Sequence, residues 1–135
     1  MKKIHFDKKI VVTAAFFAAF TVVLGAFGAH LLKNMVDSEA VGTFETGVRY
    51  QMYHSLALLV LGFASSVPDK ISKWVSRFFV LGMVLFSGSI YLLALKSVLP
   101  FSVSFLGPVT PLGGLLLILG WLWLAIGLLT IKGID

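Results

Sequence analysis

The side chains best suited to chemistry lie in one short stretch of the sequence, residues 43–54. At about 100° of rotation per residue, six of them fall on one half of a helix. The six are Glu45, Thr46, Arg49, Tyr50, Tyr53 and His54. Glu45 stands four residues before Arg49 and Tyr50 four before His54, spacings that allow an intrahelical ion pair and a hydroxyl–imidazole contact. Gln51 and Ser55 point the other way.

Three of these residues together suggest the binding of a small molecule or ion. Arg49 has the geometry to hold an anionic headgroup or a carboxylate through two hydrogen bonds, and Glu45 would balance its charge. His54 would exchange a proton near neutral pH. With polar residues from other parts of the chain they define a candidate ligand-binding pocket: His30, Glu45, Arg49, Tyr50, Tyr53, His54, Ser87 and Tyr91.

The elements that position this pocket are predicted to be membrane-spanning helices. The 135 residues are 59% hydrophobic and 13% charged, a balance that a water-soluble domain of this size does not normally carry. Four segments reach or approach the ~20 apolar residues that a spanning helix needs. We therefore predict an all-α integral membrane four-helix bundle, one domain over residues 1–135, with helices at approximately 10–32, 43–67, 70–97 and 112–131.

Two details of this architecture bear on the pocket. Thr43 is the expected N-cap of the second helix, which puts Glu45 in the first turn, where an acidic side chain is favourable. The loop between the third and fourth helices, residues 101–111, is apolar and rich in glycine and proline. We expect this outer loop to fold back onto the bundle, because its backbone cannot face lipid without hydrogen bonds.

The basic residues predict the orientation, because short loops rich in lysine and arginine stay in the cytoplasm. Eight basic residues lie on the side of both termini and three on the other side. The eight are Lys2, Lys3, Lys8, Lys9, Lys70, Lys73, Arg77 and Lys132, and the three are Lys33, Arg49 and Lys96. We expect a multi-pass protein of the plasma (inner) membrane with both termini in the cytoplasm.

The polar face of the second helix is expected to point into the bundle, since an ionisable group at membrane depth costs on the order of 2.5–3.5 kcal/mol. If Glu45 pairs with Arg49 there, removing Glu45 alone would leave a cation unpaired, at about 3–5 kcal/mol. The simpler interpretation is that these polar side chains only join helices. We favour that interpretation for the face from Glu45 to His54.

Four segments resemble a known family. They are Gly25–His30, Thr46–His54, Leu85–Tyr91 and Thr110–Gly114. In content and order they are similar to the bacterial domain of unknown function 423 family, which includes a eukaryotic relative, transmembrane protein 256. The resemblance covers nearly the whole chain. It implies a four-helix membrane protein whose activity has not been assigned, and it implies no catalytic residue.

Three classes of function fit the residues. The first is an accessory or interaction protein that packs with itself, as a homo-oligomer, or with a larger membrane complex. The second is binding or transport of a small solute, lipid headgroup or proton through a polar pocket in the outer leaflet. The third is a haem- or metal-binding protein, in which His30 and His54 would hold haem iron or, with Glu45, a zinc ion.

The sequence contains no motif typical of catalysis or of nucleotide binding. There is no cysteine, which excludes thiolate metal sites and cysteine nucleophiles. We find no nucleotide-binding loop, serine elbow or paired carboxylates, so no catalytic residue, metal site or cofactor is predicted. The formal charge of +5 comes from basic residues that flank apolar runs. These residues predict contact with membrane lipids rather than with nucleic acid.

Overall fold

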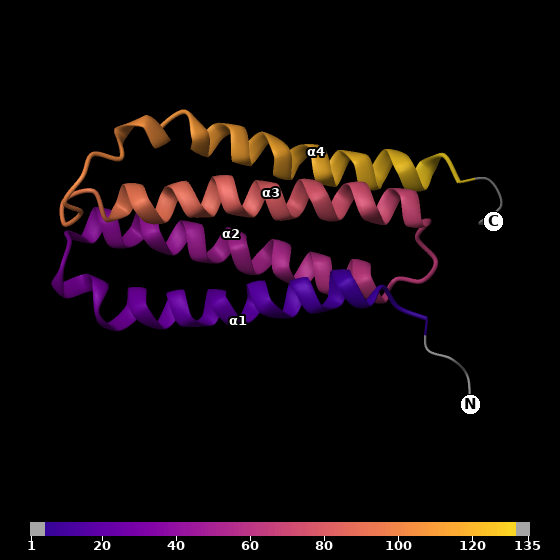
Figure 1. The fold of residues 1–135 in the computed structure, drawn as a ribbon, viewed down its shortest axis with the longest axis horizontal. Helices are drawn as coiled ribbons and strands as arrows, with labels where there is room; N and C mark the ends of the chain where they lie inside the picture. The colour runs from indigo at the N-terminus through magenta and orange to yellow at the C-terminus, as the bar shows by residue number, and fades with distance from the viewer. Residues whose placement is uncertain (1–4, 132–135) are drawn as a thin grey trace.

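The computed structural model describes residues 5–131 and folds them into four long helices (Figure 1). Two short 3₁₀ turns lie in the connections. In chain order the elements are α1 (Lys8–His30), η1 (Leu32–Asn34), α2 (Ser38–Phe63), α3 (Asp69–Ala94), η2 (Ser104–Leu106) and α4 (Val109–Leu129). The all-α four-helix prediction is confirmed, and α1, α3 and α4 begin and end within three residues of the predicted bounds.

The second helix begins earlier than predicted. Asp7 caps α1 and Asp37 caps α2, whose first turn is fixed by the Asp37 carboxylate accepting the Ala40 N–H at 2.8 Å. Aspartate is among the best N-cap residues because its oxygen satisfies an amide that the helix leaves free. α2 therefore begins at Ser38, and the predicted N-cap, Thr43, is wrong: it lies inside the helix.

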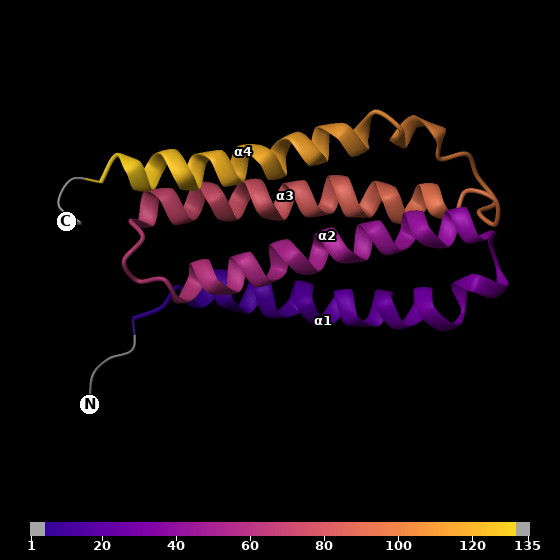
Figure 2. The ribbon, with the colours of Figure 1, turned by 180° about the vertical axis from the view of Figure 1, so that it is seen from behind.

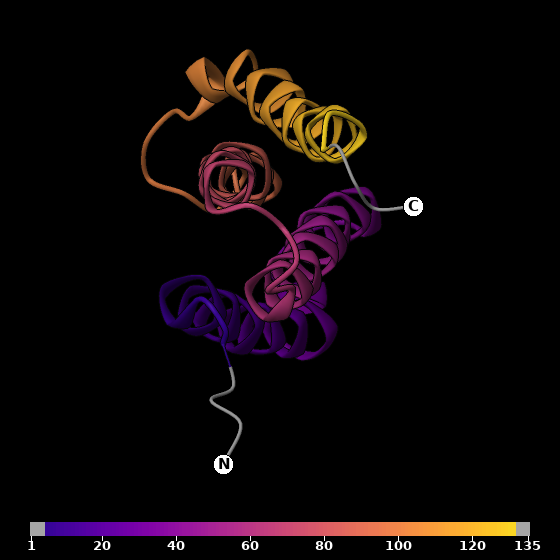
Figure 3. The same cartoon turned by 90° about the vertical axis from the view of Figure 1, so that its right-hand side faces the viewer.

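The helices stand side by side in an open row that follows the order of the chain. α1 packs on α2, α2 on α3 and α3 on α4, and the view from behind shows the same order (Figure 2). Seen end-on, α1 and α4 lie on opposite sides of the row (Figure 3). We call the end that holds the start of α1 and the end of α4 the terminal end. The opposite end holds the connections from α1 to α2 and from α3 to α4 (Figure 1).

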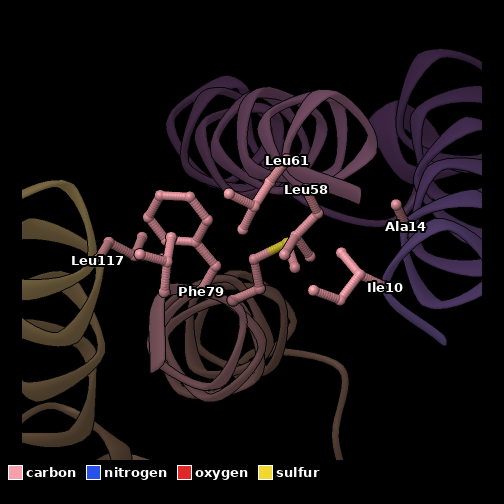
Figure 4. Close-up of a cluster of buried hydrophobic side chains, with 8 residues drawn as sticks. Ile10, Ala14, Leu58, Leu61, Phe79 and Leu117 are labelled. Carbon is pink, nitrogen blue, oxygen red and sulfur yellow. The ribbon is translucent and has the colours of Figure 1, made fainter. Parts of the chain in front are cut away.

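Two apolar clusters hold the row together. The larger lies toward the terminal end, and side chains from all four helices meet in it (Figure 4). It consists of Ile10, Ala14, Leu58, Leu61, Val75, Phe79, Met83 and Leu117. The smaller cluster, at the opposite end, consists of Leu32, Phe44 and Ala94. The polar side chains of α2 lie along the helix between these clusters.

Close helix contacts in the row depend on glycine. A Cβ atom built on Gly113 of α4 would collide with the backbone of Phe86 on α3, and one built on Gly82 of α3 would lie 2.5 Å from the Leu117 side chain of α4. Small residues at these positions let α3 and α4 approach closely, as is common between helices in membranes.

Three helices are long and apolar enough to cross a membrane. Counted with their adjoining 3₁₀ turns they are Lys8–Asn34, Asp69–Ala94 and Ser104–Leu129. α2, although 26 residues long, does not reach the same apolar character, because Arg49, Gln51 and His54 lie in its middle. The helix with the polar residues is therefore the least lipid-like of the four.

Candidate functional site: the two faces of α2

Gln51 joins three helices on the face of α2 that turns into the row. Its side chain is 3% exposed. The amide Nε2 donates to the Phe17 carbonyl of α1 at 3.3 Å, and the Oε1 accepts the Tyr91 hydroxyl of α3 at 2.7 Å. Both ends of the amide are used, so Gln51 works as a structural bridge.

Two serines extend this polar contact along the same face. Ser87 of α3 donates to the Gly47 carbonyl at 2.8 Å, and Ser55 of α2 donates to the Gln51 carbonyl at 2.6 Å. Gly47 permits the approach, since a Cβ atom there would lie 2.7 Å from the Tyr91 ring. We call the buried residues Gly47, Gln51, His54 and Ser55 the inward face of α2.

His54 is buried and both of its ring nitrogens are occupied. Nδ1 lies 2.7 Å from the Tyr50 carbonyl, and the Trp121 indole Nε1 donates to Nε2 at 3.0 Å. A carbonyl only accepts and an indole N–H only donates, so the proton of the neutral ring is on Nδ1. The ring edge also packs on Phe79, with the centroids 5.0 Å apart. His54 therefore has no nitrogen free for a metal ion or haem iron.

The other candidate residues of α2 lie on the outside of the chain. Glu45, Arg49, Tyr50 and Tyr53 are exposed, and Tyr53 is 56% exposed. The prediction that this polar face points into the bundle is therefore wrong for these four residues and right for His54. The reason is steric: the helix turns its small residue, Gly47, toward α3, and that rotation carries the larger charged side chains outward.

The predicted ion pair between Glu45 and Arg49 is not formed. Arg49 instead donates from Nη2 to the Thr46 hydroxyl at 3.3 Å. That contact points the arginine toward the start of α2, the direction in which helical side chains lean. A guanidinium carries five N–H donors, and within residues 5–131 only one of them has an acceptor.

The depth of Arg49 follows from the contacts of its neighbour. Gly47 packs on Ile90 and Tyr91, and Lys96 follows at the end of α3. At 1.5 Å per residue, Arg49 lies about 10 Å farther into the row than Lys96. In a membrane-spanning α2, an exposed arginine at this level would need a partner outside the chain or would have to reach back to the interface.

The remaining candidate residues do not join a common pocket with the exposed ones. Ser87 and Tyr91 belong to the contacts of the inward face. His30 is exposed at the end of α1, whereas His54 lies ten residues beyond Phe44, which packs on Gly28. His30 lies two residues beyond Gly28 in the opposite direction, so the helix rise separates the levels of the two histidines by about 18 Å. A ligand-binding role for the eight residues stays a prediction.

Sequence reasoning missed Gln51 and Trp121 as members of the polar contacts. A signal for Gln51 is present, because Gln51 and Ser55 are four residues apart on α2, as Ser87 and Tyr91 are on α3. Two such pairs on adjacent helices predict a polar seam. For Trp121 there is no comparable signal, since its partner is 67 residues away.

The buried polar groups of the described residues form hydrogen bonds with one another or with the backbone. Within residues 5–131, every buried side-chain nitrogen and oxygen has a hydrogen-bond partner. Over the same residues, no three His, Asp or Glu side chains gather closely enough to hold a metal ion. The charged groups of Glu45 and Arg49, in contrast, lie outside this interior and are exposed.

The outward residues border a groove at their terminal end. It has a volume of ≈ 420 Å³, and it is lined almost entirely by apolar side chains of α2, α3 and α4. Tyr53, Leu56 and Val60 form one wall, Trp121 lies on the other, and Phe79 lies at the bottom. The groove exists because α2 and α4 are held apart by α3 in the open row.

Comparison with known proteins gives the family. A family model described as "Protein of unknown function (DUF423)" matches residues 24–114. A UPF0382 membrane protein of Staphylococcus saprophyticus is 40% identical over 120 residues, which cover 89% of this chain and 96% of the relative. The UPF0382 inner membrane protein YgdD of Escherichia coli is 38% identical and covers 91% of each chain. No solved structure matches. The chain is a membrane protein that belongs to the DUF423 family.

Proposed function

We propose that this protein is a four-pass protein of the plasma membrane that works by association, as an accessory or interaction protein that binds another membrane protein through the outward face of α2. The observation that carries the proposal is the exposure of Glu45, Arg49 and Tyr53 on a helix that packs between two membrane-spanning candidates, α1 and α3. No cofactor is needed for such a role.

The proposal of four crossings is supported by the connections between helices. α1 and α3 run in the same direction, and each is apolar enough to span a membrane. The chain between them must return to the starting side, and α2 is the element that does so, packed along both neighbours. Its 26 residues give a length of about 39 Å, which exceeds the ~30 Å hydrocarbon thickness.

The proposal that both termini lie in the cytoplasm is supported by charge. α1 begins and α4 ends at the terminal end, and Lys8, Lys9, Lys70 and Lys73 lie at that end too. Of the other basic residues used for the prediction, Lys2, Lys3 and Lys132 lie outside the described residues. Short basic loops favour the cytoplasmic side.

Association fits the arrangement better than a pathway through the chain. Within residues 5–131 the buried polar side-chain atoms already have hydrogen-bond partners, which disfavours a route for a solute or proton through the interior. Outward charges at membrane depth are costly unless a neighbour supplies a partner. A partner at α2 would therefore remove an electrostatic penalty that the described part of the chain does not itself relieve.

A native mass spectrum of the protein, extracted together with its own lipid, tests the proposal. We expect a homo-oligomer or a complex with a second protein in fixed stoichiometry. Arg49→Leu should release it, and the matched control Lys96→Leu, which removes a charge at the end of α3, should not. A monomer with no protein partner in native lipid would contradict the proposal.

A further inference from the structure

We propose that the partner is a second copy of this chain, packed through the outward stripe of α2 about a two-fold axis, with Arg49 of each copy bound to Glu45 of the other. This inference rests on the proposed function in association and names the partner. It follows from the shape of the stripe, from its charges and from the groove beside it.

The outward stripe of α2 has the spacing of a helix–helix seam. Its members are all exposed, and each follows the previous one by three or four residues: Gly42, Glu45, Arg49, Tyr53, Leu56, Val60 and Phe63. At 100° per residue they occupy a sector of about 80°. A stripe this narrow that runs most of the length of a helix suits contact with one other helix.

The charges on the stripe complement each other between two copies. Both copies insert in the same orientation, so their α2 helices run parallel and the same residues face each other across the axis. Arg49 leans one turn toward the start of α2, as its bond to Thr46 shows. Glu45 of the other copy lies one turn in that direction. The two-fold axis then makes two ion pairs, each able to use the two-pronged geometry of arginine and carboxylate.

Both ends of the stripe leave room for a second helix to pack closely against α2. Gly42 is open, because a Cβ atom there would have no atom within 4 Å, so the backbones can approach at that end. At the terminal end the stripe borders the groove of ≈ 420 Å³ between α2 and α4. Leu56 and Phe63 of the other copy are exposed apolar side chains that can fill it.

An exchange of charges tests the pairing. Arg49→Glu gives a chain with two acidic residues on the stripe, and Glu45→Arg gives one with two basic residues. Self-association is measured by energy transfer between two fluorophores in lipid bilayers at low protein density. We expect each variant alone to associate at least about 10-fold more weakly than the native chain, which is 1.4 kcal/mol. An equal mixture of the two should return to within about 3-fold of the native value.

The mixture separates pairing between copies from pairing within a chain. In each variant the two charges on one chain are alike, so only contact between unlike chains restores attraction. Lys96→Glu, which reverses a charge just after α3 and away from α2, is the control and should associate like the native chain. Circular dichroism in detergent checks that each variant is as helical as the native protein.

Cross-linking gives a second test that does not change the charges. The sequence has no cysteine, so a single introduced cysteine has no background. Gly42→Cys should form a disulfide between copies under mild oxidation, because the same residue faces itself across the axis. Gly88→Cys is the matched control on α3, since its Cβ also meets no atom within 4 Å. It should stay unlinked.

The outcomes distinguish this inference from the proposed function. A native dimer that the charge mixture fails to restore, with no Gly42→Cys disulfide, overturns the second-copy interface through α2 while association stands. A monomer that retains a different protein, lost in Arg49→Glu, also overturns the inference alone. A monomer that loses a bound anionic lipid in Arg49→Glu assigns Arg49 to a headgroup and overturns both proposals.

Discussion

The inward and outward faces of α2 carry similar residue types and differ in what those residues contact. Gln51 and His54 turn inward, and each of their side-chain nitrogens and oxygens has a partner from a neighbouring helix or from the backbone. Arg49 and Glu45 turn outward and have almost no partner. The comparison teaches that polar character alone does not mark a functional site in a membrane. Polar groups that the folded chain leaves without partners are the better candidates for a functional contact.

The largest expected effect comes from enlarging the small residue of the inward face. Gly47→Leu would push side-chain atoms into the Tyr91 ring, which already lies 2.7 Å from the position of a Cβ. We expect the free energy of unfolding to fall by about 3 kcal/mol, the upper range for overpacking. Thermal unfolding in dilute detergent measures it. Gly42→Leu, on the outward face with open space, should change it by less than about 0.5 kcal/mol. If Gly47→Leu and Gly42→Leu lowered the free energy of unfolding equally, the inward and outward faces of α2 would not differ in packing.

The next effect is loss of the three-helix bridge. Gln51→Leu removes the Gln51 Oε1 that accepts the hydroxyl of half-buried Tyr91. We expect a loss of about 2 kcal/mol in the free energy of unfolding. Adding Tyr91→Phe removes the orphaned hydroxyl, so the double variant should be more stable than Gln51→Leu alone. A double variant with the full sum of the two losses would show that the hydrogen bond does not join the helices.

Much of this architecture could be predicted from the sequence, and the choice of face could not. Apolar runs of about 20 residues and their basic ends identify the helices, because length and hydropathy are local properties. Which half of α2 is buried depends on Gly47 meeting Tyr91, a contact between residues far apart in sequence. Helical periodicity groups Arg49 with His54 because both lie within one half of the helix. In the folded chain they are separated, because His54, at one edge of that half, contacts α4, whereas Arg49 does not.

A smaller effect is expected from the one polar bond between α2 and α4. Trp121→Phe removes the indole donor and leaves Nε2 of His54 without its partner. Measured couplings of this kind in membranes average ~0.6 kcal/mol, so we expect a coupling free energy of that size between Trp121→Phe and His54→Leu. A double-mutant cycle of thermal unfolding measures it. A coupling near zero would mean that apolar packing alone holds α4 at this level.

The smallest effect on the folded monomer should come from Arg49, although the sequence predicts that it pairs with Glu45. Its guanidinium bonds only Thr46, and both residues lie at the surface of the chain. Arg49→Leu should therefore change the free energy of unfolding in dilute detergent by less than about 0.5 kcal/mol, and Arg49→Leu with Glu45→Leu should be additive. In bilayers the same substitution should abolish the change in energy transfer that reports self-association, because the cation finds its acceptor only in the second copy. If Glu45→Leu instead cost the monomer about 3–5 kcal/mol and the double variant were much milder, an ion pair within the helix would be established. The difference between the inward and outward faces of α2 would then disappear.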